Sequence, residues 1–122
     1  MLLNDFYTIA DLRVASGAFR ADLLLNAAHP IFGGHFPDRP VLPGACQLQM
    51  VREMLSQVTG REYHLVKADT IKFITLIDPR NSIQLELALN YEPGEAGQLR
   101  VTATLSAATK PALKFIGVFR AG

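Results

Sequence analysis

The sequence has a single cysteine, almost no net charge and no long hydrophobic run. Cys46 alone can form neither an intramolecular disulfide nor a zinc cluster of several thiolates. The 12 Lys and Arg residues nearly balance the 11 Asp and Glu residues, so the net charge of +1 gives no bulk attraction for nucleic acid or an anionic membrane. No apolar stretch approaches the length of a membrane span, and residues 1–10 lack the charged start and apolar run of a signal peptide. We therefore expect a cytoplasmic protein without a membrane span.

The composition is that of an ordinary globular protein. Of the 122 residues, 49% are hydrophobic and 19% are charged, which is enough apolar surface to form a core without disulfides. No internal repeat, low-complexity tract or linker interrupts the chain, so we predict one domain over residues 1–122. The sequence contains no Gly-rich phosphate-binding loop and no cluster of metal-ligating residues. We therefore expect neither a cofactor nor a metal.

Apolar and polar residues alternate in several segments, as they do in half-buried strands. The alternation is clear over residues 83–90, 99–106 and 113–119, and weaker over residues 19–25 and 69–76. A stretch rich in Gly and Glu separates the first two segments, which predicts a hairpin. Pro111 suits the first position of the third segment. The pattern predicts an antiparallel sheet of about five or six strands.

One segment has helical periodicity. Residues 44–59 contain no proline and no internal glycine, and Gly60 follows as a stop signal. Apolar residues recur there at helical spacing, at Ala45, Leu48, Val51, Leu55 and Val58. Met50 and Met54 extend the apolar surface around most of the helix, which indicates burial inside the protein. We predict an α+β fold in which the sheet wraps around one long central helix.

An unusual loop precedes this helix. Residues 29–44 contain four prolines and three glycines, which fix an irregular backbone path that usually serves to position other groups. The path ends at the first turn of the helix, where the amides of Gly44 and Ala45 are free to donate hydrogen bonds. Such amides suit a carbonyl oxygen that gathers negative charge during a reaction.

The residues of this loop also form a motif, Gly34-His35-Phe36-Pro37-x-x-Pro40-Val41-Leu42-Pro43-Gly44. It resembles the GHFPxxPxxPG signature of the bacterial 3-hydroxyacyl-acyl-carrier-protein dehydratases, the FabZ/FabA group. Three further segments are similar to the family's core strand, turn and next strand: Ile71-Lys72-Phe73, Asp78-Pro79-Arg80 and Ile83-Gln84-Leu85. The resemblance implies a hot-dog fold, a dimer with joined sheets and a tunnel between protomers for an acyl chain on phosphopantetheine.

The resemblance also implies roles for individual residues. His35 corresponds to the base that removes the proton α to the thioester, and an imidazole titrates near working pH. The amide of Gly44 or Ala45 polarises the thioester carbonyl, and Phe36 and Pro43 are expected beside it in the substrate-binding site. The carboxyl group that protonates the departing hydroxyl falls at Gln49 in this chain. An amide has no proton to give near neutral pH.

Three sources of the missing proton stay open. Glu53 lies one helical turn beyond Gln49 on the same face. Asp38 in the loop is the second, weaker candidate. A heteromer is the third, because sites in the family combine residues of two protomers and a partner can supply the carboxyl. Outside the motif, His29 and Cys46 are interpreted as structural, His29 as a partner of the backbone and Cys46 as a small buried residue.

We predict a 3-hydroxyacyl-acyl-carrier-protein dehydratase or dehydratase-like subunit in fatty-acid or related polyene-type lipid synthesis. Its partner is an acyl carrier protein bearing a 3-hydroxyacyl thioester. A homodimer or larger even homo-oligomer is expected, with a heteromer formed with a dehydratase homologue as the alternative. Two other functions stay open: a non-catalytic acyl-carrier-binding subunit, which Gln49 favours, and a hot-dog thioesterase, which the His-Phe-Pro loop disfavours.

Overall fold

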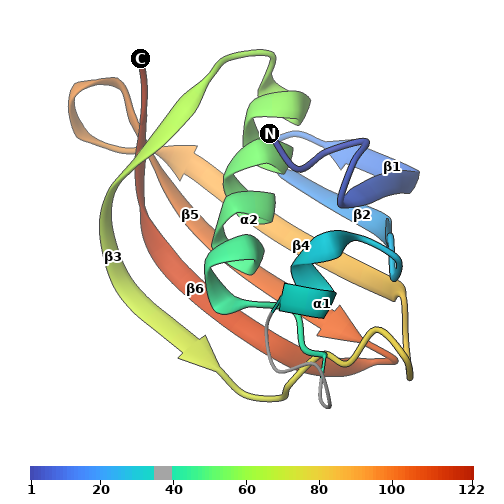
Figure 1. The fold of residues 1–122 in the computed structure, drawn as a ribbon. Helices are drawn as coiled ribbons and strands as arrows, with labels where there is room; N and C mark the ends of the chain where they lie inside the picture. Colours follow the sequence, from blue (N-terminus) through green and yellow to red (C-terminus); the bar gives the residue numbers. More distant parts are fainter. Residues whose placement is uncertain (35–39) are drawn as a thin grey trace.

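The computed structural model of the chain describes residues 1–34 and 40–122 (Figure 1). Two strands and a short helix come first, namely β1 (Tyr7–Ala15), β2 (Ala18–Leu25) and α1 (Pro30–Gly34). The long helix α2 (Gly44–Thr59) and strand β3 (Tyr63–Phe73) follow. The chain then forms β4 (Gln84–Pro93), the 3-10 turn η1 (Glu95–Gly97), β5 (Gln98–Ala107) and β6 (Lys110–Ala121).

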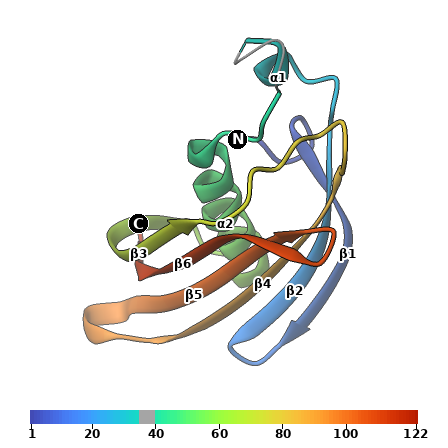
Figure 2. The same cartoon turned by 90° about the horizontal axis from the view of Figure 1, so that it is seen from below.

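The strands form one antiparallel sheet that curves around α2. Their order is β1-β2-β4-β5-β6-β3, and every neighbouring pair is antiparallel. The concave face of the sheet bends around one side of α2, and no helix of the described residues covers the outer face of the sheet (Figures 1 and 2). Strands β1 and β3 form the two edges, and each has a single neighbour. The predicted α+β arrangement of a curved sheet and one central helix is therefore confirmed.

The predicted alternation explains which side chains form the core. On β4 and β5 the buried residues are every second one: Leu85, Leu87, Leu89, Val101, Ala103 and Leu105. Buried residues of α2 pack against this face: Met50, Val51, Met54 and Leu55. The helix has the predicted bounds, and Gly60 ends it in the left-handed conformation, with φ 73° and its N–H bonded to the Ser56 carbonyl. No helix of the described residues is long and apolar enough to span a membrane.

The sequence pattern was least informative at the two edges of the sheet. Strand β1 was not predicted, and β3 spans Tyr63–Phe73 instead of residues 69–76. Almost all residues of both strands are at least partly exposed, because an edge strand has one neighbour and here little packs on either face. Without a buried face, the alternation that identifies a half-buried strand is missing from β1 and only weak at the end of β3.

Gly117 on β6 is required by the close approach of β3. A Cβ atom at this position would lie 2.6 Å from the Lys67 carbonyl oxygen, a backbone atom that cannot rotate away. We expect Gly117→Ala to lower the free energy of unfolding by about 1–3 kcal/mol, the usual cost of overpacking. Urea unfolding checks this value against Gly94→Ala, where the nearest atom to the new Cβ is 3.6 Å away. Equal stabilities of the two variants would contradict the prediction.

Candidate active site

The loop that leads into α2 is anchored at Leu42. The Leu42 N–H donates to the Ile77 carbonyl over 2.8 Å, and the Leu42 carbonyl accepts a hydrogen bond from Nε2 of Gln47 over 3.2 Å. The Leu42 side chain is buried. Pro43 then takes an extended conformation, with φ −60° and ψ 144°, immediately before the helix. The path of the chain into α2 is therefore fixed by contacts with both the helix and a later loop.

The first turn of α2 presents free donors. The Gln47 N–H bonds to the Pro43 carbonyl over 3.1 Å, which begins the helical hydrogen-bond pattern. Within the described part of the chain, the amides of Gly44, Ala45 and Cys46 have no acceptor, and no side chain caps the helix. These amides and the helix dipole favour negative charge at this point. Three predicted substrate-binding residues, Pro43, Gly44 and Ala45, thus lie together at the helix start.

A phenyl ring lies against this helix start. A Cβ atom at Gly44 would be 2.7 Å from Cζ of Phe73, so only glycine leaves the ring in its observed place. Phe73 ends β3 and is half exposed. The donors of α2 are therefore flanked by an apolar group from the edge strand.

One turn further along, Gln49 lines a small cavity of about 160 Å³ between α2, β3 and β6. Its other lining residues are Leu48, Val51, Arg52, Leu65, Phe115 and Phe119. Most of these side chains are apolar, and Gln49 is the one uncharged polar group among them. The cavity therefore has the chemistry that suits an apolar chain carrying one hydrogen-bonding group.

Glu53 is buried and fully hydrogen bonded. The residue is only 3% exposed, which is unusual for an acidic residue. Oε2 accepts from the Leu2 N–H over 2.8 Å, and Oε1 accepts from the Leu3 N–H over 2.9 Å and from the Tyr7 hydroxyl over 3.1 Å. Nε2 of Gln49 donates to Oε2 over 2.7 Å. In this arrangement Glu53 accepts four hydrogen bonds and donates none.

The pKa values of Glu53 and Tyr7 agree with this assignment of donors and acceptor. Burial by itself raises the pKa of the Glu53 carboxyl, but the hydrogen bonds from Leu2, Gln49, Leu3 and Tyr7 together outweigh burial and hold the pKa below its ordinary value. Burial, followed by the charge of Glu53, raises the pKa of Tyr7 well above its ordinary value. The carboxyl group is therefore ionised near neutral pH and the Tyr7 phenol keeps its proton.

The lowered pKa of Glu53 predicts how stability depends on pH. A group with a folded pKa below its unfolded value of about 4.3 stabilises the protein above that pH and loses this contribution as the pH falls through the folded pKa. We expect Glu53→Gln to cost about 1.5–3 kcal/mol near neutral pH, the range for hydrogen bonds to a charged group. Chemical unfolding at several pH values should show this difference shrinking below about pH 4. Glu92→Gln, at an exposed position of β4, is the control and should show no such trend.

The remaining candidates divide into described and undescribed residues. The predicted base His35, the substrate-binding residue Phe36 and the alternative acid Asp38 lie outside the described residues. His29 has a structural environment: its Nδ1 accepts from the Ile31 N–H over 3.1 Å, so Nε2 carries the proton and donates to Asp5 over 3.1 Å. Burial raises the pKa of the Cys46 thiol, which keeps it protonated and disfavours a nucleophilic role.

Several residues that shape this site have no direct signal in the sequence. Gln47 anchors Leu42, Tyr7 and the Leu2–Leu3 backbone bind Glu53, and Phe73 lies against Gly44. The one available signal was the presence of Gln47 and Glu53 on a helix that is otherwise apolar where it faces the core. Buried polar side chains are hydrogen bonded, so such residues predict partners without identifying them.

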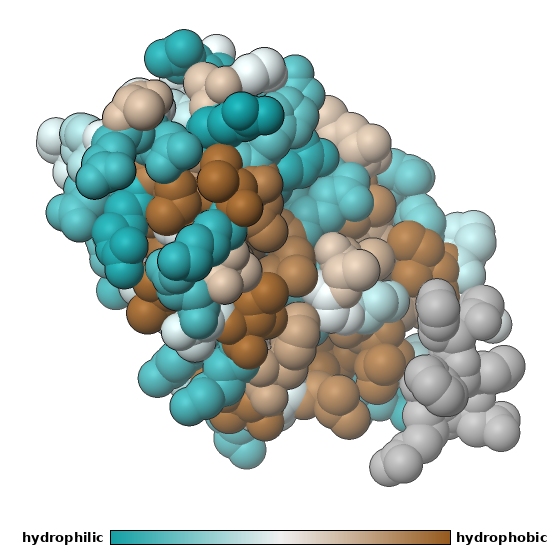
Figure 3. Space-filling view, turned by 90° about the vertical axis from the view of Figure 1, so that its left-hand side faces the viewer, coloured by the Kyte–Doolittle hydropathy of each residue, from teal (hydrophilic) through white to brown (hydrophobic). Residues whose placement is uncertain are grey.

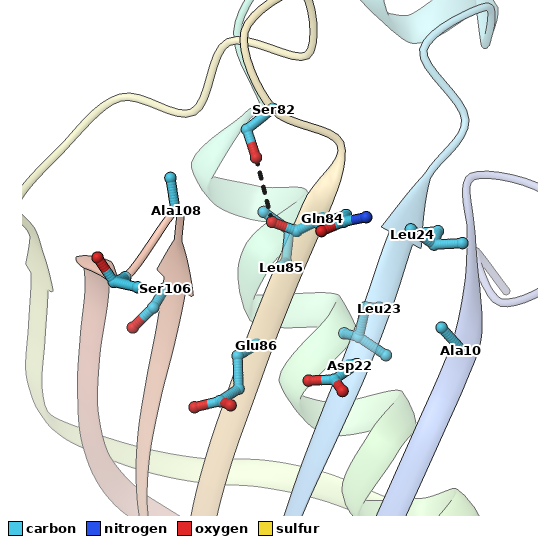
Figure 4. Close-up of a pocket in the computed structure, with 11 residues that line it drawn as sticks. Ala10, Asp22, Leu23, Leu24, Ser82, Gln84, Leu85, Glu86, Ser106 and Ala108 are labelled. Atoms are coloured by element: carbon cyan, nitrogen blue, oxygen red, sulfur yellow. Dashed lines mark hydrogen bonds between the residues drawn. The ribbon is translucent and has the colours of Figure 1, made fainter.

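A larger groove lies on the opposite face of the sheet. It has a volume of about 710 Å³, and α2 passes behind the sheet in the view of Figure 4. Its two carboxylates are already paired, Asp22 with Arg13 over 3.1 Å and Glu86 with Arg20 over 2.9 Å. Across residues 1–34 and 40–122, no group of three or more His, Cys, Asp or Glu residues is placed to hold a metal ion. The helix α2 and its cavity are therefore the better candidate for the active site.

Known proteins are similar to this chain in sequence. The family model described as ApeI-like, ApeI dehydratase, matches residues 12–111. The 3-hydroxyacyl-[acyl-carrier-protein] dehydratase FabZ of Natranaerobius thermophilus is 27% identical over 81 residues, which cover 61% of this chain and 57% of that protein. The protein of the same name from Rickettsia massiliae is 22% identical over 99 residues, which cover 75% of this chain and 68% of that protein. The chain thus spans little more than half the length of the first relative.

Solved structures share the fold. The dehydratase heterocomplex ApeI:P from Xenorhabdus doucetiae has a chain with a TM-score of 0.69 and 21% identity, covering 92% of this chain and 96% of that one. A hypothetical thioesterase from Streptococcus pneumoniae, solved with coenzyme A, has a TM-score of 0.65 and 9% identity, covering 95% of this chain and 85% of that one. At these identities the likeness concerns the fold alone. The expected hot-dog fold is confirmed.

Proposed function

Because the chain belongs to the ApeI-like dehydratase family, we propose that it is a 3-hydroxyacyl-[acyl-carrier-protein] dehydratase or a dehydratase-like subunit. One observation carries the proposal: the motif of residues 34–44 leads into a helix whose first amides have no acceptor among the described residues, beside a largely apolar cavity that Gln49 lines. A thioester carbonyl at those amides would extend its acyl chain along apolar side chains. We further propose a role in cytoplasmic fatty-acid or related lipid synthesis, with an acyl carrier protein as the partner.

The proposed reaction eliminates water across the α and β carbons of the acyl group. His35 removes the α proton, and the amide of Gly44 or Ala45 donates a hydrogen bond to the thioester oxygen as it gains negative charge. The electron pair of the α carbon forms the new double bond while the bond to the 3-hydroxyl group breaks. The departing hydroxyl requires a proton to leave as water.

Neither Gln49 nor Glu53 of the isolated chain supplies that proton. Gln49 can donate a hydrogen bond but no proton. Glu53 is ionised and accepts four hydrogen bonds, so we assign it no role as an acid. Asp38 or a carboxyl group of a partner chain remains. If neither contributes, the chain is a slow dehydratase or a non-catalytic acyl-carrier-binding subunit.

The exposed edge of β3 favours assembly with a second chain. Large apolar residues are exposed on and just after this strand: Leu65, Val66, Ile71, Phe73, Ile74 and Leu76. Figure 3 views the molecule from this side, where apolar residues form a band between polar ones. An unpaired strand edge with apolar side chains is a common site of pairing between chains. We propose a homodimer or larger even homo-oligomer joined here, or a heteromer with a dehydratase homologue.

Mass spectrometry of hydroxyacyl carrier substrates tests the proposal. The purified protein is incubated with 3-hydroxyacyl groups on an acyl carrier protein, alone and with co-expressed homologues, and light scattering gives the assembly under the same conditions. Loss of one water molecule supports a dehydratase. Water loss only with a homologue supports the heteromer. Release of a free carrier thiol indicates a thioesterase, and no reaction in either mixture, with binding retained, indicates a non-catalytic subunit.

A further inference from the structure

The hydrogen bond between Gln49 and Glu53 fixes which end of the Gln49 amide faces its neighbour. An ionised carboxylate can only accept hydrogen bonds, so Gln49 must turn its Nε2 toward Glu53, as observed over 2.7 Å. The amide group is planar, and its oxygen occupies the other branch. If the amide were turned over, two oxygen atoms would meet without a proton between them.

Glu53 is itself held rigidly. The backbone N–H groups of Leu2 and Leu3 and the hydroxyl of Tyr7 bind its two oxygens at 2.8, 2.9 and 3.1 Å. The carboxylate is thus tied to a segment before β1 and to the start of β1, and it is buried between them and α2. A buried group with all its partners in place rarely changes its rotamer, so the orientation of Gln49 is fixed as well.

The oxygen of Gln49 is available for a ligand. Within residues 1–34 and 40–122, Oε1 of Gln49 receives no hydrogen bond, although its Nε2 is engaged. Gln49 is half buried and lines the cavity of about 160 Å³, whose other walls are apolar side chains and Arg52. An acceptor without a partner among the described residues, in a cavity lined mostly by apolar side chains, favours a ligand that brings a donor to that point.

We propose that Glu53 is a positioning residue, which holds Gln49 so that Oε1 of Gln49 is available to the cavity. This oxygen accepts a hydrogen bond from the 3-hydroxyl group of the bound acyl chain. The inference rests on the proposed function for the thioester site and adds a basis for selectivity. A saturated acyl chain and a 3-oxoacyl chain have no proton at this position, so both leave the Gln49 oxygen unpaired. The site therefore distinguishes 3-hydroxyacyl groups from the other acyl groups that a carrier protein presents.

Binding of stable substrate analogues tests the inference. Pantetheine amides carrying 3-hydroxyacyl, saturated and 3-oxoacyl chains of equal length are titrated by calorimetry into the protein, in the assembly in which it purifies. We expect the 3-hydroxyacyl amide to bind about 3- to 10-fold more tightly than the other two, the worth of one hydrogen bond.

Two variants assign the selectivity to the two residues. Gln49→Met keeps the length of the side chain and removes the strong acceptor, so the ratio of dissociation constants should fall to about one. Glu53→Gln leaves Gln49 unchanged. The new amide at position 53 can either accept or donate a hydrogen bond, so it no longer fixes the orientation of the Gln49 amide. The ratio of dissociation constants should therefore fall although Gln49 is intact. If Glu53→Gln does not fold, Glu53→Asp, which withdraws the carboxylate from Gln49, makes the same test.

Tyr7→Phe is the matched control. It removes one of the three hydrogen bonds that hold Glu53 but keeps the carboxylate charge and the bonds from the Leu2 and Leu3 N–H groups. Since these two bonds still hold the carboxylate, stability should fall while the ratio of dissociation constants stays that of the native protein. An equal fall in Tyr7→Phe and Glu53→Gln would show that loosening alone lowers selectivity, which overturns the positioning role. Tight and equal binding of all three analogues to the native protein overturns the inference and leaves the proposed function standing. Absence of binding by all three overturns both.

Discussion

Gln49→Glu is expected to raise the rate of dehydration about tenfold or more, because it supplies an ionisable group where the native chain has an amide. General acid catalysis contributes about 10²–10⁴-fold when the acid is well placed. The new carboxyl has nearly the size of the amide and lines the same cavity. Only part of this rate increase is expected, because the protonated carboxyl at position 49 can donate to Glu53 instead of to the departing hydroxyl.

The pH dependence of this variant follows from its neighbour. Glu53 keeps three of its four hydrogen bonds in Gln49→Glu and stays ionised. A like charge one turn away raises the pKa of the new carboxyl. The acid form therefore persists to higher pH than for an ordinary carboxyl, and the gained activity is lost as the pH rises through the raised pKa. A profile of kcat/KM against pH measures this limit.

The double variant Gln49→Glu/Glu53→Gln should lose the gained activity at a lower pH than Gln49→Glu. It lacks the Glu53 charge that raises the pKa of the new carboxyl, and its amide at position 53 can donate a hydrogen bond that stabilises the ionised form. The cost is that the Leu2 N–H loses its acceptor, so a lower unfolding midpoint is expected.

Gln57→Glu is the control for added charge. It places the same group at an exposed position of α2, away from the cavity, and should leave the rate unchanged. If the native protein already dehydrates at the rate expected with a well-placed acid, and none of these variants changes that rate, this account is contradicted. A gain that appears only with a co-expressed homologue would support the heteromer.

His35→Ala is expected to lower the rate of dehydration by about 10²–10⁴-fold, the usual contribution of a general base. No other described histidine is placed to replace it. His29 uses both ring nitrogens in hydrogen bonds with Asp5 and Ile31, and His64 lies on the surface 3.2 Å from the carbonyl of Gly122. His64→Ala is therefore the matched control and should retain the native rate.

The fold should survive the loss of His35. The chain is anchored again at Leu42, whose backbone bonds to Ile77 and to the side chain of Gln47. Thermal unfolding should give the same midpoint for the native protein and His35→Ala within about 2 °C, a shift expected for less than 1 kcal/mol. A folded variant with an unchanged rate would show that His35 is not the base.

The sequence by itself determined the parts of the protein that depend on local pattern. Helix α2 has the predicted bounds, Gly44–Thr59, because apolar periodicity and the glycine after it are properties of neighbouring residues. Strands β2, β4, β5 and β6 were found near their observed bounds because one face of each is buried by the core. The loop motif was sufficient to identify the family, since its prolines and glycines stand at fixed spacing.

Tertiary structure alone decided what the buried polar residues do. Glu53 had the sequence position of a substitute acid, yet three of its four hydrogen-bond donors lie 51, 50 and 46 residues away at Leu2, Leu3 and Tyr7. Their charge-stabilising contacts make the carboxyl an acceptor, and no local pattern can encode partners at such separations. The same holds for the edge strands β1 and β3, and for Phe73 against Gly44. Each depends on which segments the fold brings together, because a contact between distant segments leaves no periodic signal in either one.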